Sequence, residues 1–194
     1  MFRKLIGMLK QPDVFFEGVR EEGFLQPFLF LLQVSAVIAF FTPLVNYLGW
    51  ASTDRNSSYQ AQILAWQITQ EYLLPRLGFW AYVVEAFLIL GLALLIAIFM
   101  TGFLHLLFRL SGGKGPILNA WKAACYGTGP CVLLGWIPYW SLFVATWSLV
   151  LQFYYGPKVL YRMREGIALL ILAFIVGATL FELMTKGTTV GFGT

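Results

Sequence analysis

Residues 79–108, FWAYVVEAFLILGLALLIAIFMTGFLHLLF, decide the fold class of this chain. The stretch carries one fixed charge, Glu85, and is otherwise almost entirely apolar. An α-helix rises about 1.5 Å per residue, so roughly 20 apolar residues cross the ~30 Å hydrocarbon core of a bilayer. The core helix of a soluble domain does not need such a run, and we therefore expect a transmembrane helix over 79–108.

Four further apolar runs flank this one, at 26–48, 118–136, 138–155 and 166–184. The whole chain is 59% hydrophobic and 11% charged, whereas a typical soluble domain is about a quarter charged. These patterns predict an all-α integral membrane protein, with residues 1–194 forming one membrane domain built on a bundle of five transmembrane helices.

Two segments outside the spans are typical of helices that lie on the membrane surface. In residues 1–24, apolar and basic side chains alternate at helical spacing and predict one apolar and one basic face. The apolar positions are Phe2, Leu5, Ile6 and Leu9, and the basic positions, where we expect contact with lipid headgroups, are Arg3, Lys4 and Lys10. Residues 49–78 predict an outer loop that contains a second amphipathic helix.

The distribution of Lys and Arg predicts the orientation. Ten of the thirteen fall on one side of the five-span arrangement: Arg3, Lys4, Lys10, Arg20, Arg109, Lys114, Lys122, Lys158, Arg162 and Arg164. The positive-inside rule then places the N-terminus in the cytoplasm and the C-terminus outside the cell membrane.

Gly127, Gly129 and Pro130 interrupt the third run and predict a helix break or a packing site there. A re-entrant third segment is the competing interpretation. It would move one of the later basic clusters to the outside, so we favour a full span.

Glu85 is the candidate functional residue within the membrane, because a carboxylate at the centre of a transmembrane helix costs roughly 2.5–3.5 kcal/mol to insert. A protonated or hydrogen-bonded structural role is the alternative. Lys122, near the inner end of the third span, is expected to extend toward the headgroups.

Several function classes find no support. The chain has one His, which excludes paired-His metal motifs, and it contains neither G-x-S-x-G nor H-E-x-x-H. The basic residues lie in short clusters beside the apolar runs rather than in one surface stripe, so nucleic acid is not an expected partner. We expect no enzyme activity, no catalytic residues, no cofactor and no metal.

Two stretches carry a family resemblance. The segment QPDVFFEGVREEGFLQPFLF places Pro12, Phe15 and Phe16 in a P-x-x-F-F pattern, and LLFRLSGGKGPILNAWKAACYGTGPCVLLGWIP contains a Gly-Gly-Lys loop and the third span. Its matching positions are Gly112, Gly113, Lys114, Tyr126, Pro130 and Pro138. In this order the two stretches resemble the prokaryotic, archaeal branch of the YIP family (Ypt/Rab-interacting proteins).

The resemblance implies a multi-pass membrane protein whose eukaryotic relatives bind small prenylated GTPases and take part in membrane traffic. The sequence lacks the Asp-Leu-Tyr-Gly-Pro motif of those relatives, and its Tyr-Gly-Pro at 155–157 is placed after the fourth span. GTPase binding is therefore implied by the eukaryotic relatives alone.

Two functions follow as hypotheses. The first is a non-enzymatic scaffold or adaptor that contacts membrane lipids, another membrane protein or a second copy of itself. The second is a small transporter or channel, with a pathway beside the broken third span and Glu85 as its coupling carboxylate.

Overall fold

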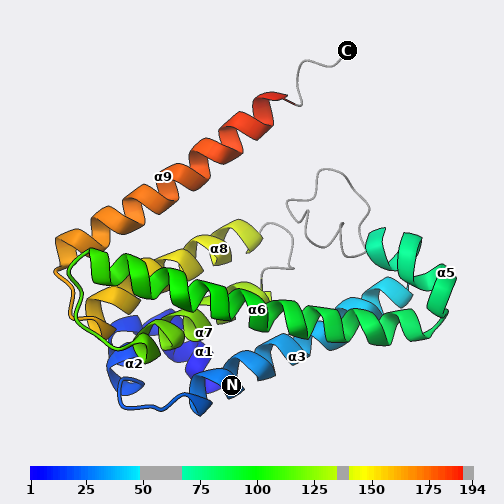
Figure 1. The fold of residues 1–194 in the computed structure, drawn as a ribbon, viewed down its shortest axis with the longest axis horizontal. Helices are drawn as coiled ribbons and strands as arrows, with labels where there is room; N and C mark the ends of the chain where they lie inside the picture. The colour runs from blue at the N-terminus through cyan, green and yellow to red at the C-terminus, as the bar shows by residue number, and fades with distance from the viewer. Residues whose placement is uncertain (49–66, 135–139, 190–194) are drawn as a thin grey trace.

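The computed structural model describes residues 1–48, 67–134 and 140–189, and these residues form helices joined by short turns (Figure 1). Pro138, one of the positions that carry the family resemblance, lies outside the described residues. In chain order the elements are α1 (Phe2–Lys10), α2 (Pro12–Gly18), α3 (Leu25–Tyr47), η1 (Thr69–Leu73), α5 (Leu74–Leu77), α6 (Trp80–Leu110), α7 (Ile117–Leu134), α8 (Trp140–Val150), η2 (Leu151–Leu160) and α9 (Glu165–Thr189).

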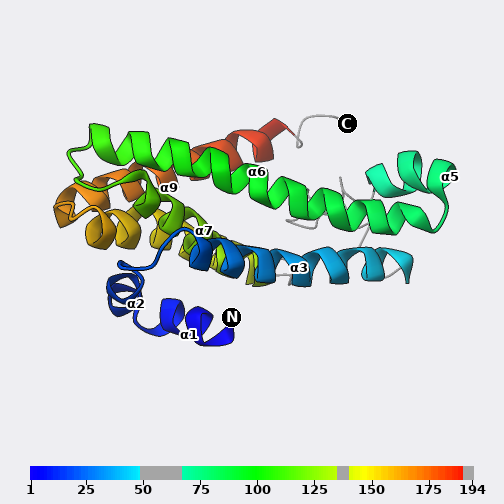
Figure 2. The ribbon, with the colours of Figure 1, turned by 60° about the horizontal axis from the view of Figure 1, so that its bottom comes forward.

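Two long apolar helices, α3 and α6, lie side by side and run in opposite directions (Figures 1 and 2). Within the described residues, Leu25–Leu44 and Trp80–Leu110 are long and apolar enough to cross a membrane. The apolar part of α9, Glu165–Thr179, is shorter. Helices occupy the described parts of all five predicted runs.

Helix α7 is the centre of the assembly and packs against α3, α6, α8 and η2. Its small residues make this possible, because Ala120, Ala123 and Ala124 are fully buried and let neighbouring helices approach closely. Helix α7 continues through Pro130 to Leu134, so the described residues show no break there, and a bend of the helix at Pro130 stays a prediction. Gly127 and Gly129 serve the alternative role of packing sites. A Cβ built on Gly127 would lie 2.3 Å from Gln152 Cγ, and one on Gly129 would lie 2.5 Å from Phe30 Cε1.

The helix of the fourth predicted span extends beyond that span. Helix α8 continues directly as the π-helix η2 to Leu160, so Tyr155–Pro157 lies within the helix, and the end of the membrane span at Tyr155 stays a prediction. Gly156 permits this course because its backbone approaches α7, where a built Cβ would lie 3.0 Å from Ala123 Cβ. The close approach to α7 therefore explains a glycine that reads as a helix end in the sequence.

The Gly-Gly-Lys loop between α6 and α7 is fixed against the turn that follows η2. Gly112 adopts φ +84°, which favours glycine, and the Gly113 amide donates to the Phe108 carbonyl at 2.8 Å. The Lys114 amide donates to the Tyr161 carbonyl at 2.9 Å. Burial raises the pKa of Tyr161 to about 12, so its hydroxyl stays protonated near neutral pH and donates to the Pro116 carbonyl at 3.2 Å.

The described part of the outer loop, residues 67–77, is helical and consists mainly of η1 and α5, which lie next to the N-terminal end of α6 (Figure 1). The rest of the predicted amphipathic helix over 49–78 lies outside the described residues.

Candidate functional site at the junction of the N-terminal segment and α7

The N-terminal segment, residues 1–24, folds back onto the helix bundle. Pro12 starts α2 at the first helical position, where its missing amide costs no hydrogen bond. Helix α2 packs on η2, and α1 packs on α2 at the outer edge of the bundle (Figure 2). The segment contacts the buried side of α7 in two ways, through aromatic rings and through a polar cluster.

Aromatic side chains join the segment to α7 and α3. The Phe15 ring meets the Tyr126 ring edge-on, with centroids 5.2 Å apart, and Phe30 of α3 lies 5.1 Å from the same ring. Phe16 is fully buried beside Phe15. Three positions that carry the family resemblance (Phe15, Phe16 and Tyr126) thus lie together in one core, although Tyr126 is more than a hundred residues from the other two in sequence.

A polar cluster of Lys4, Glu22 and Tyr126 lies beside these rings. Lys4 Nζ donates to Glu22 Oε1 and to the Tyr126 hydroxyl, both at 2.7 Å. The Tyr126 hydroxyl donates in turn to Glu22 Oε2. Lys4 Nζ also lies 4.8 Å from the centre of the Tyr126 ring. Hydrogen bonds with a charged partner each contribute about 1.5–3 kcal/mol, so this triad ties α1 and the end of the segment to the middle of α7.

Two further side chains of α7 bind the backbone of the same segment. Lys122 is 1% exposed, and its Nζ donates to the Arg20 carbonyl at 2.5 Å. The Trp121 indole donates to the Phe24 carbonyl at 3.1 Å, and its ring stacks on Phe24. The expectation that Lys122 extends toward the headgroups is wrong, because the N-terminal segment covers it and supplies an acceptor.

The exposed face of α1 differs from the predicted one. Leu5 and Met8 face the protein and are buried, whereas Phe2, Ile6 and Leu9 are 69%, 53% and 44% exposed. The single predicted apolar face is therefore two faces, one packed on the bundle and one open. We call Phe2, Ile6 and Leu9 the outer apolar stripe.

The predicted headgroup residues separate in the same way. Arg3 and Lys10 are exposed on α1 near the outer apolar stripe, and Lys4 is directed inward to Glu22 and Tyr126. Arg3 and Lys10 thus have the exposure that the predicted headgroup contact requires, and the contact itself stays a prediction.

An ion pair ties α2 to the bundle near its outer edge. Lys158 Nζ lies 3.3 Å from Asp13 Oδ1 and 3.9 Å from Glu165 Oε1. Partial burial lowers the pKa of Lys158, but the hydrogen bonds with Asp13 and Tyr154 outweigh it and the net pKa is raised. The ammonium therefore stays charged and links α2, η2 and the start of α9.

Glu85, the predicted residue within the membrane, is 3% exposed in α6. It is not among the residues of the N-terminal junction, and its proposed coupling role stays a prediction. Among the described residues, no group of three or more His, Cys, Asp or Glu side chains could hold a metal ion.

The polar cluster is the feature that sequence reasoning missed. Lys122 and Tyr126 are polar residues four positions apart within an apolar run, and this spacing places them on one helix face. That face could have indicated a polar contact on the third span. The sequence does not indicate that Glu22 is its partner, because Glu22 lies in a polar stretch that is typical of an exposed surface.

Comparison with known proteins returned one match. The Yip1 domain model matches residues 6–184 of the chain, which leaves out residues 1–5 of the N-terminal segment and residues 185–189 of α9. Neither the curated proteins nor the solved structures gave a match.

Proposed function

The chain belongs to the Yip1 family of non-catalytic membrane proteins, and from this premise we propose that it is a membrane scaffold whose N-terminal segment meets the lipid surface. One observation carries the proposal. The polar cluster fixes α1 to the bundle while the outer apolar stripe stays open. An amphipathic helix held in this way presents a rigid surface to lipid or to a partner embedded in it.

We also propose five membrane crossings with the N-terminus in the cytoplasm. The arrangement of basic residues supports this orientation. The loop with Lys114 contacts the turn with Tyr161, and Lys122 contacts the N-terminal segment, so three basic clusters gather at one end of the bundle. Arg76 of α5 lies at the other end (Figure 1). One-sided Lys and Arg are typical of the cytoplasmic face.

The proposal predicts that α1 enters the headgroup region more deeply in anionic bilayers. A fluorophore on Leu9→Cys, in a Cys125→Ala/Cys131→Ala background, should be quenched by lipid-borne nitroxides. Each basic residue near an anionic surface contributes ~1 kcal/mol. Arg3→Gln/Lys10→Gln should therefore remove most of the gain in quenching that phosphatidylglycerol produces over phosphatidylcholine.

The matched control is Arg76→Gln, an exposed cation at the opposite end, which should leave the quenching unchanged. Quenching that is equal in both lipids and in all variants would refute the contact of Arg3 and Lys10 with anionic headgroups, and no quenching in either lipid would refute the lipid contact of α1. Lys4 is unsuited to this test because its substitution would also break the cluster with Glu22 and Tyr126.

The alternative, a small transporter or channel, has Glu85 as its distinguishing residue. Packing beside the third span supports the scaffold instead, since Gln152 and Phe30 fill the space next to Gly127 and Gly129. A flux assay with the parent protein and Glu85→Gln in lipid vesicles separates the two functions. Ion or proton flux that is lost in Glu85→Gln would favour transport, and no flux in either protein would favour the scaffold.

A further inference from the structure

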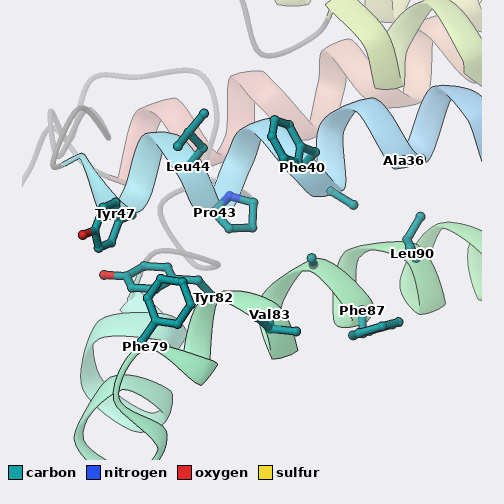
Figure 3. A pocket seen from close by; sticks show the side chains of 12 residues that line it. Ala36, Phe40, Pro43, Leu44, Tyr47, Phe79, Tyr82, Val83, Phe87 and Leu90 are labelled. Atoms are coloured by element: carbon teal, nitrogen blue, oxygen red, sulfur yellow. The ribbon is translucent and has the colours of Figure 1, made fainter.

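An apolar groove runs between the second half of α3 and the first half of α6, at the end of the bundle that carries α5 (Figure 3). Its volume is about 490 Å³. Ala36, Ala39 and Ala86 are the small residues among its lining, and Phe40 and Phe87, which also line it, are 66% and 70% exposed. This region is separate from the N-terminal junction.

The two ends of the groove differ in polarity. Figure 3 shows Tyr47 and Tyr82 together at one end with their hydroxyls pointing the same way, and Ala36 and Leu90 toward the other end. The Tyr47 and Tyr82 rings meet edge-on with centroids 5.4 Å apart, and Phe79 lies beside them. Tyrosines with an apolar ring and a polar tip are typical of the boundary between headgroups and hydrocarbon.

The length of the groove matches one leaflet. Ala36 and Tyr47 are eleven residues apart on α3, which corresponds to ~16 Å at 1.5 Å per residue. Half of a ~30 Å hydrocarbon core is ~15 Å. A groove that begins at interfacial tyrosines and extends this far would end near the bilayer midplane.

The length and the polarity of the groove decide between occupants. Its lining is apolar apart from the hydroxyls of Tyr47 and Tyr82 at one end. A transmembrane helix of a second copy or of a partner would continue across both leaflets, whereas the groove extends over one leaflet. A groove of this length, with its polar groups at the headgroup end, matches one acyl chain.

We propose that this groove binds one acyl chain of a membrane lipid, with the lipid headgroup held near the hydroxyls of Tyr47 and Tyr82. Both walls belong to helices that are apolar enough to lie in hydrocarbon, so the chain enters sideways from the bilayer. Such a lipid would fill the divide between α3 and α6 and act as a structural part of that half of the bundle.

Photolabelling of the protein in nanodiscs tests this proposal. The probe is phosphatidylglycerol with a diazirine in one acyl chain, and labelled peptides are identified by mass spectrometry. We expect the label to concentrate on Ala86 and Phe87, ahead of Ile98 and Phe99, which are exposed on the same helix but outside the groove.

Filling the groove provides the second arm. Ala36→Phe/Ala86→Phe should lower labelling at the groove by roughly tenfold, equivalent to ~1.4 kcal/mol. Ala173→Phe, on an exposed position of α9, is the matched control and should leave it unchanged. Even labelling of Phe87 and Phe99 in the parent protein would overturn the proposal without any variant. A filled variant that keeps its labelling, or that changes the oligomeric state instead, would overturn it as well.

Discussion

Gly127→Ala and Gly129→Ala should each destabilise the protein by about 1–3 kcal/mol, the usual cost of inserting a methyl group into a packed core. The added Cβ would lie 2.3 Å from Gln152 Cγ or 2.5 Å from Phe30 Cε1, both inside van der Waals contact. Gln152 and Phe30 are themselves 5% and 3% exposed, so neither side chain has free space to move into. We expect lower apparent unfolding temperatures in nanodiscs, measured by loss of helical circular dichroism.

Two glycines of α6 provide controls with the opposite sign. Gly91 and Gly102 have no atom within 4 Å of a built Cβ, and alanine is favoured over glycine in a helix by up to ~1 kcal/mol. Gly91→Ala and Gly102→Ala should therefore be neutral or stabilising. If all four variants behaved alike, close packing at Gly127 and Gly129 would not be their role.

Breaking the polar cluster should release the N-terminal segment from α7. Lys4→Glu places a carboxylate beside Glu22, and Glu22→Lys places an ammonium beside Lys4, so each single variant replaces attraction with repulsion. The two side chains are 32% and 22% exposed, and water screens part of this effect. We expect a loss of about 1–3 kcal/mol in the docking of the segment, measured as faster hydrogen exchange in α1 and α2.

The combined variant Lys4→Glu/Glu22→Lys restores opposite charges and should recover part of the protection. Glu17→Gln is the matched control, because the Glu17–Arg20 pair is long, at 3.9 Å, and the Glu17 side chain is 62% exposed, and such pairs contribute little. Equal exchange in the single and the combined variants would show that the charge pair does not hold the segment.

The long apolar helices were predictable because their signal is local. An apolar run long enough to cross hydrocarbon can be recognised from consecutive residues alone. Helices α3 and α6 accordingly begin and end within two residues of their predicted bounds. Membership of the YIP family was also predicted from short motifs and is confirmed by the domain match over residues 6–184.

The remaining features depend on contacts between distant residues. Gly127 reads equally well as a break or as a close contact, and the side chain of Gln152 on another helix decides between them. The predicted fourth span ends just before Gly156 and Pro157, whereas η2 continues through both residues with Gly156 packed on Ala123.

Lys4 illustrates the same limit in the candidate site. Its spacing on an amphipathic helix indicates a headgroup contact, whereas its partner Tyr126 lies 122 positions away in sequence. No local pattern in residues 1–24 indicates that contact.

Photocrosslinking from residue 15 tests the central claim, that the N-terminal segment packs against α7 as an integral part of the bundle. In Phe15→p-benzoylphenylalanine, the ring would replace one that lies 5.2 Å from Tyr126, and irradiation in nanodiscs should join it to the α7 peptide that contains Tyr126. Adducts to lipid alone, with none to α7, would contradict the account and show that the segment lies apart from the bundle on the membrane surface.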